Sequence, residues 1–223
     1  MRGLLVCSLL LAACSHRAGP STFDRELAAL PATDAAYAPP RSPKPRALAP
    51  GQWVKQRVVD QDGHHTLVTT KVIGLFGHQV WLERETESEQ GTRARKLLVG
   101  LGDRNDARTI DVFQCWLKHA DGRVEKLAPM LIGAEKPRLQ SELAALVLAR
   151  PAQGQEDIAV SAGRFARAYK ARVKERLLGV EVESESWWHP EVPLNGALRT
   201  RRVGAPGGSE LVAFGLRGAK SVF

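Results

Sequence analysis

The sequence is poor in cysteine, with three residues in 223. Cys7 and Cys14 lie in or at the end of an apolar stretch at the start of the chain, and Cys115 stands alone farther on. If residues 1–13 are removed and Cys14 is modified, as argued below, no intramolecular disulfide can form. The apolar core must then hold the fold. Because Cys115 lies in a β-like run, we expect a buried apolar side chain rather than a reactive thiol.

The sequence also lacks the motifs of common enzymes. It contains no Gly-x-Ser-x-Gly nucleophile elbow and no phosphate-binding glycine-rich loop. His64 and His65 are adjacent beside a turn signal, but no third metal ligand has a recognisable spacing, so we expect solvated imidazoles. We therefore predict no catalytic residue, no metal site and no cofactor, and a function other than catalysis.

Acidic residues do not form a defined catalytic pair either. Four glutamates alternate along one candidate strand, and we expect them to face water rather than to act as acid and base. They are Glu83, Glu85, Glu87 and Glu89. The formal net charge of +8 comes from lysines and arginines that are spread along the chain without a dense basic run. Nucleic acid is therefore not an expected partner.

Long hydrophobic runs are absent, and the longest apolar stretch, residues 4–13, is too short to span a bilayer as a helix. With Arg2 before it, this stretch is typical of a secretory signal peptide. It ends in Leu11-Ala12-Ala13-Cys14, which resembles the lipobox of bacterial lipoproteins. The resemblance implies cleavage before Cys14 and a lipid on Cys14 that anchors the protein to a membrane. An ordinary signal peptide that happens to contain a cysteine is the alternative.

The rest of the chain divides into two parts. Residues 14–50 are punctuated by prolines, so we expect a lipidated cysteine followed by an extended tether, with a short helical turn possible at 23–30. Residues 51–223 are long enough for one domain with a core of its own. Short β-like runs separated by turn residues predict strands at 53–60, 66–73, 79–84, 93–101 and 110–119.

A two-residue turn at Asp121-Gly122 would place Trp116 opposite Leu127 and Lys118 opposite Glu125. At the other end of the domain, residues 197–223 predict two more strands around 204–208. Residues 140–150 are the clearest helix candidate, with Pro151 beyond its end.

One stretch permits two interpretations. Residues 165, 169, 173 and 177 are spaced four apart, as on a helix. A hairpin folded about residues 178–179 would instead bring opposite charges together in three cross-strand pairs. These are Arg176 with Glu181, Lys174 with Glu183, and Arg172 with Glu185. Because three complementary pairs share one register, we predict strands.

The predicted fold is thus mainly β (α+β): a curved antiparallel sheet, half-barrel-like, with one or two helices packed on it. The segments 51–54, 160–165, 187–196 and 210–215 together resemble bacterial periplasmic domains of the LolA/LolB-like half-barrel type. That resemblance implies an apolar cleft, partly plugged by helices, that carries lipids or lipoproteins. Trp187 and Trp188 must point to opposite faces of an extended strand, so we expect at least one of them at the cleft mouth or the surface.

These observations predict an envelope protein, most simply an outer-membrane lipoprotein facing the periplasm, that binds an apolar ligand or a lipidated partner. The alternative is a structural or assembly lipoprotein that binds another envelope protein through its surface. The lining of the cleft would distinguish them.

Overall fold

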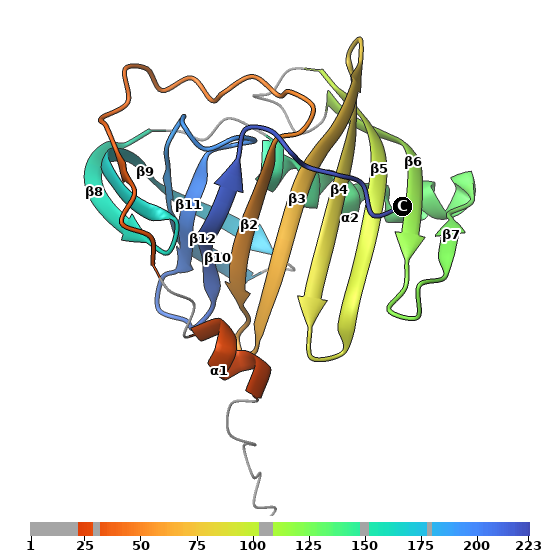
Figure 1. The fold of residues 1–223 in the computed structure, drawn as a ribbon, viewed down its shortest axis with the longest axis horizontal. Helices are drawn as coiled ribbons and strands as arrows, with labels where there is room; N and C mark the ends of the chain where they lie inside the picture. The colour runs from red at the N-terminus through yellow and green to blue at the C-terminus, as the bar shows by residue number, and fades with distance from the viewer. Residues whose placement is uncertain (1–21, 29–31, 103–108, 148–151, 178–179) are drawn as a thin grey trace, which may run out of the picture.

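The computed structural model describes residues 22–28, 32–102, 109–147, 152–177 and 180–223, and these residues form one open, curved sheet of twelve strands with two helices. The mainly β fold expected from the sequence is confirmed (Figure 1). The helices are α1 (Thr22–Ala28) and α2 (Pro129–Val147). The strands are β1 (Ala36–Tyr37), β2 (Trp53–Val59), β3 (His65–Phe76), β4 (Gln79–Ser88), β5 (Gly91–Leu101), β6 (Ile110–Lys118), β7 (Val124–Lys126), β8 (Gly154–Val160), β9 (Gly163–Leu177), β10 (Val180–Trp188), β11 (Ala197–Arg202) and β12 (Gly208–Gly215).

The strands follow the spatial order β1-β9-β10-β11-β12-β2-β3-β4-β5-β6-β7, and β8 pairs with β9 outside this path. Neighbouring strands are antiparallel except for the short β1, which runs parallel to β9. The last strand, β12, therefore lies beside β2, the first strand of the domain, at the centre of the sheet (Figure 1). Helix α2 crosses one face behind β3 to β6, and residues 216–223 cross the other. We call these the inner and the outer face.

The charge pattern predicted the long hairpin correctly. In the β9–β10 pair, Arg176 lies opposite Glu181, Lys174 opposite Glu183, and Arg172 opposite Glu185. The guanidinium Nε of Arg172 lies 2.9 Å from a carboxylate oxygen of Glu183. The tip of the hairpin, residues 178–179, falls outside the described residues. Cross-strand complementarity therefore outweighed the helical spacing of the same stretch.

The register predicted for the β6–β7 hairpin was wrong by one residue. Trp116 lies opposite Lys126 and Lys118 opposite Val124. The amide of His119 donates to the carbonyl of Arg123, so the loop has three residues rather than two. Gly122 supplies the positive φ of 86° that such a loop requires at its last position. In this register the ammonium of Lys126 lies over the ring of Trp116.

Helix α2 begins eleven residues before the predicted start at residue 140, at Pro129. Pro129 favours a helix start because its missing N–H is not needed there. Pro137 lies inside the helix, where proline normally breaks the pattern. Packing outweighs that cost, since Ile132 and Leu139 are buried in the core together with Leu143 and Val147. The helix ends at Val147, and residues 148–151 fall outside the described residues.

The core lies between α2 and the inner face of the sheet. The inward side chains of β3 to β6 include Val72, Leu82, Val99 and Cys115, and each is at most 2% exposed. Cys115 is fully buried, as expected, and burial raises the pKa of its thiol. The core thus relies on close-packed apolar side chains, with no disulfide among the described residues.

Part of the segment predicted to be an extended tether packs on the domain. The ring of Tyr37 in β1 stacks on Phe165 with centroids 4.2 Å apart. The buried His189 bonds through Nε2 to the carbonyl of Ala38 at 3.1 Å. In α1, Asp24 accepts a hydrogen bond from the amide of His65 at 2.6 Å. The stacking of Tyr37 and the contact with buried His189 therefore fix parts of the predicted tether to the domain. Proline content alone had predicted that this segment would not pack on the domain.

Within the described ranges, neither helix has both the length and the apolar character needed to cross a bilayer.

Candidate functional site

A pocket of about 740 Å³ opens on the inner side of the sheet, and its volume lies within the range of small-molecule sites. It extends from α2 to the ends of β2 and β12, where the β2–β3 and β11–β12 turns lie. Most of its surface is apolar. Its lining includes Val54, Gln56, Val58, Arg84, Glu142, Leu146, Leu194, Asn195, Thr200 and Arg202.

Sheet register places three polar side chains in a row beside the inner end of this pocket, and Arg84 among them lines the pocket itself. Thr70 on β3 lies opposite Arg84 on β4, and Arg84 lies opposite Arg95 on β5. The next inward row contains Leu82 and Leu97, which are buried. The polar row therefore marks the boundary between the apolar core and the pocket.

Glu142 from α2 reaches down onto this row. One of its carboxylate oxygens lies 3.0 Å from Nη1 of Arg95 and 3.3 Å from Nη1 of Arg84. Its other oxygen accepts from Nε of Arg138, one turn earlier on the helix, at 3.2 Å. One carboxylate is thus shared by three guanidinium groups. A carboxylate can accept several hydrogen bonds, so Glu142 can bond to all three arginines at once. Its single negative charge does not neutralise their three positive charges.

Burial makes the charge of Arg84 costly. Desolvation lowers the pKa of its guanidinium, while Glu142 raises it and the neighbouring Arg95 lowers it further. The buried Nε of Arg84 and the buried hydroxyl of Thr70 find no hydrogen-bond partner in the described part of the chain. These two groups line a separate void of about 10 Å³ beside the pocket, and Arg84 lines both. Buried polar groups of this kind are normally paired, so Arg84 has an unused donor at the edge of the pocket.

The loop between β10 and β11 closes one side of the pocket and is tied to α2. The side-chain amide of Asn195 donates to the carbonyl of Ala145 in α2, and its oxygen accepts from the amide of Ala197 at 3.1 Å. Leu194 holds a positive φ of 63°, which is unusual for a residue with a branched side chain. It is nevertheless buried against the core. The loop therefore forms a fixed wall.

The two tryptophans predicted at the cleft do not line this pocket. Trp187 is 4% exposed, lies between the cations of Lys170 and Arg201, and bonds through Nε1 to Glu156. Trp188 is 1% exposed and stacks on Tyr169. The expectation that one of them would lie at the surface was wrong, because neighbouring strands and long side chains cover both faces of β10. Cys14, the predicted lipid attachment site, falls outside the described residues.

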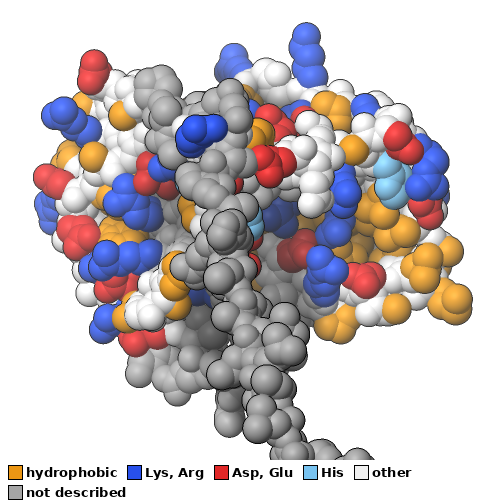
Figure 2. Space-filling view, turned by 90° about the horizontal axis from the view of Figure 1, so that it is seen from below, with side chains coloured by type: hydrophobic (Ala, Val, Ile, Leu, Met, Phe, Trp, Pro, Cys, Tyr) orange, Lys and Arg blue, Asp and Glu red, His pale blue; other side chains and the backbone are white. Residues whose placement is uncertain are grey.

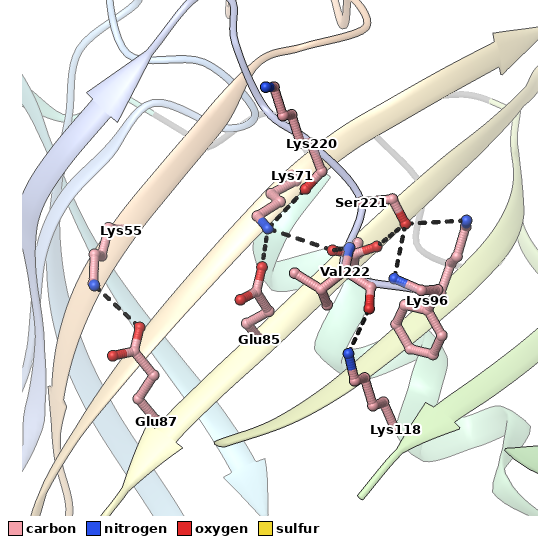
Figure 3. A network of polar contacts seen from close by, with 11 residues as sticks. Lys55, Lys71, Glu85, Glu87, Lys96, Lys118, Lys220, Ser221 and Val222 are labelled. Carbon is pink, nitrogen blue, oxygen red and sulfur yellow. Dashed lines mark hydrogen bonds and ion pairs between the residues drawn. The ribbon is translucent and has the colours of Figure 1, made fainter. Parts of the chain in front are cut away.

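The prediction that the glutamates of β4 face water was wrong for Glu83, which is fully buried on the outer face. Residues 219–223 cover it: Ser221 Oγ donates to Glu83 at 2.7 Å and the amide of Val222 donates at 3.0 Å. Lysines from three strands, Lys71, Lys96 and Lys118, bond to the same segment at Lys220, Ser221 and Val222 (Figure 3). We call residues 217–223 the C-terminal strap.

The adjacent histidines lie beside Asp24 of α1. The exposed His64 lies 3.7 Å from Asp24, and His65 begins β3. Among the described residues, no three His, Cys, Asp or Glu side chains gather in a way that could hold a metal ion.

Sequence reasoning missed Arg84 and Glu142 as candidate site residues. The signal was present in part, since alternation along β4 places Arg84 on the same face as Val80 and Leu82. A charged residue that continues an apolar face is unusual and indicates a site. Glu142 could not have been paired with it, because the crossing of α2 over β4 and β5 depends on tertiary packing.

Comparison with known proteins adds little to this description. No protein-family model matches the sequence, and no curated protein matches it. Among solved structures, the chain is similar to a Bacteroides fragilis protein described as exported and as having a YmcC-like fold. The match has a TM-score of 0.37 and 8% sequence identity, and covers 77% of this chain and 97% of the other. At that TM-score it carries no argument about this chain's function.

Proposed function

We propose that this protein is a lipid-anchored envelope protein that holds an apolar or amphipathic ligand in the pocket between α2 and the inner face of its sheet. The observation that carries the proposal is the pocket itself. It has a volume of about 740 Å³, a mostly apolar lining, and a few polar groups at each end. Ligand sites commonly combine such features.

The proposed anchor rests on the sequence. Leu11-Ala12-Ala13-Cys14 resembles a lipobox, and residues 15–21 separate it in sequence from α1, which contacts the domain through Asp24 and Leu27. Two or more acyl chains hold a protein stably on a bilayer, whereas a single chain binds only marginally. A binding protein fixed in this way would meet ligands that leave or enter the membrane.

Native mass spectrometry tests the ligand. Residues 15–223, exported behind a signal peptide that is cleaved without lipidation and purified without detergent, are expected to carry a lipid-sized mass that organic extraction removes. Leu146→Trp fills the pocket from α2 and should abolish that mass. Leu131→Trp, on an exposed position of the same helix, is the matched control. A ligand-free mass for the unlipidated protein would contradict the proposal.

A second candidate function, docking of another envelope protein, is favoured by exposed apolar side chains on β7 and at the start of α2. Val124 and Leu131 are 47% exposed and Met130 is 82% exposed. Figure 2 shows apolar side chains gathered at this end of the molecule, among basic and acidic ones. If the pocket proves empty, crosslinking from Met130 is the experiment that follows.

A further inference from the structure

We infer that the ligand of the inner pocket is an acid, an apolar molecule with one carboxylate or phosphate group, and that Arg84 binds that group. The inference rests on the proposed function, because it assigns ligand chemistry to the same pocket. It concerns the polar row formed by Thr70, Arg84 and Arg95 under Glu142 of α2.

The polar row carries an excess of positive charge. Arg84, Arg95 and Arg138 all approach the carboxylate of Glu142, within 3.0–3.3 Å. Arg84 and Arg95 are also nearest neighbours across β4 and β5. Glu135, 3.6 Å from Arg138, is the second acid of the group, so three arginines face two carboxylates. The neighbouring Arg84 and Arg95 repel each other, and a bound anion would compensate the remaining charge.

Arg84 also has unused hydrogen-bonding capacity. It contacts Glu142 through Nη1, whereas its Nε has no partner among the described residues. A guanidinium binds carboxylates and phosphates best through two parallel N–H groups. Of the polar row, Arg84 is the member that lines the pocket itself, whereas Thr70 lies on the small void beside it. Arg84 therefore presents the kind of donor that an acid group requires.

The remainder of the pocket suits the rest of such a ligand. Beyond the polar row its lining includes Val54, Val58 and Leu194, which suit an apolar chain. At the opposite, turn end, Arg202 lies beside Gly207 together with Asp60 and Asp62. One oxygen of Asp60 accepts there from the amides of Asp62 and His64. The acid group is therefore placed at the Arg84 end, away from these two carboxylates, with its apolar part along the walls.

Photolabelling in membranes that contain the full chain tests the inference. Three probes share one diazirine-bearing alkyl chain and differ in their head: a carboxylate, a phosphate or a neutral alcohol. We expect an acidic probe to label peptides from 53–62 or 194–209 about tenfold more than the alcohol does. If the carboxylate probe labels more strongly, the ligand is a carboxylic acid. If the phosphate probe labels more strongly, the ligand is a phosphate ester.

Four variants separate ligand binding from folding. Arg84→Gln should abolish the preference for acidic probes. Arg84→Lys keeps the charge but cannot donate two parallel N–H groups to one anion, so it should retain part of the preference. Glu142→Gln removes the competing carboxylate and should raise labelling by the acidic probes. Arg123→Gln, an exposed arginine in the β6–β7 hairpin, should change nothing. If Arg84→Gln is degraded, the rise expected for Glu142→Gln decides the question.

The possible failures are distinguishable. Equal labelling of the pocket by all three probes, unchanged in Arg84→Gln and Glu142→Gln, would overturn the acid and leave the apolar carrier in place. Absence of pocket labelling by any probe would overturn the carrier function together with this inference.

Discussion

Ser221 in the C-terminal strap donates a hydrogen bond of 2.7 Å to the carboxylate of Glu83, in the middle of β4. Glu83 is fully buried, and the amide of Val222 donates to its other oxygen. Replacing Glu83 by Ala leaves these two donors without their acceptor and removes one of the partners of Lys71, which keeps Glu85 and the carbonyl of Lys220. We expect a loss of about 2–4 kcal/mol in the free energy of unfolding, measured by urea denaturation. Glu87→Ala, which removes an ion pair of Lys55 on the same strand face, should cost less than about 1 kcal/mol.

Acid should destabilise the protein through His189. This side chain is fully buried, and desolvation lowers its pKa from the usual 6.5. The unfolded chain therefore binds a proton at a higher pH than the folded chain does. Stability is retained above pH 6.5 and falls as the pH drops below it, by no more than about 1.4 kcal/mol per pH unit.

Thermal denaturation between pH 7.5 and 5.5 measures this effect. His189→Gln keeps a donor toward Ala38 but cannot titrate, so its stability should change less over this range. His78→Gln, at an exposed turn, should behave like the unchanged protein. Identical pH profiles for His189→Gln and the unchanged protein would refute the assignment.

Gly196 should not tolerate a side chain. Its φ is +75°, and an added Cβ would lie 2.6 Å from the backbone oxygen of His189. Gly196→Ala should therefore lower the free energy of unfolding by about 2–4 kcal/mol and loosen the wall of the pocket. Gly122 has a similar φ of +86°, but an added Cβ there would meet nothing within 4 Å. Gly122→Ala therefore measures only the cost of a positive φ for alanine, about 1 kcal/mol. Equal losses for the two variants would show that the close approach does not matter.

Cys115 should be inert in the folded protein. It is fully buried and its thiol pKa is raised, so the reactive thiolate is scarce. In a chain that carries both Cys7→Ser and Cys14→Ser, Cys115 is the remaining thiol, and maleimide should label it only after denaturant is added. Cys115→Ser places a hydroxyl in the core and should cost about 1–3 kcal/mol, whereas Cys115→Ala should cost less. Rapid labelling under native conditions would contradict the packing described above.

Sequence patterns predicted those parts of the fold that depend on neighbouring segments of chain. The β2–β3 hairpin followed from its turn residues, and the β9–β10 register followed from alternating charges. Patterns failed where distant segments meet. Glu83 alternates like a solvent-facing residue, and only the C-terminal strap buries it. Trp187 is covered by Lys170 and Arg201 from neighbouring strands. Arg84 shares Glu142 with Arg95 because α2 crosses two strands, which periodicity within either segment does not show.

The pairing of β2 with β12 has a consequence for how the protein folds. These strands lie at the centre of the sheet, and Trp53 pairs with Gly215 although almost the whole domain separates them in sequence. Hairpins such as β3–β4 can form as the chain emerges, but the two halves of the sheet can join only after β12 has been synthesised. Non-local pairing of this kind slows folding. A sheet that stays incomplete until its last strand is made leaves its two halves unjoined throughout synthesis, so the edges of β2 and β11 remain open to other partners until β12 arrives.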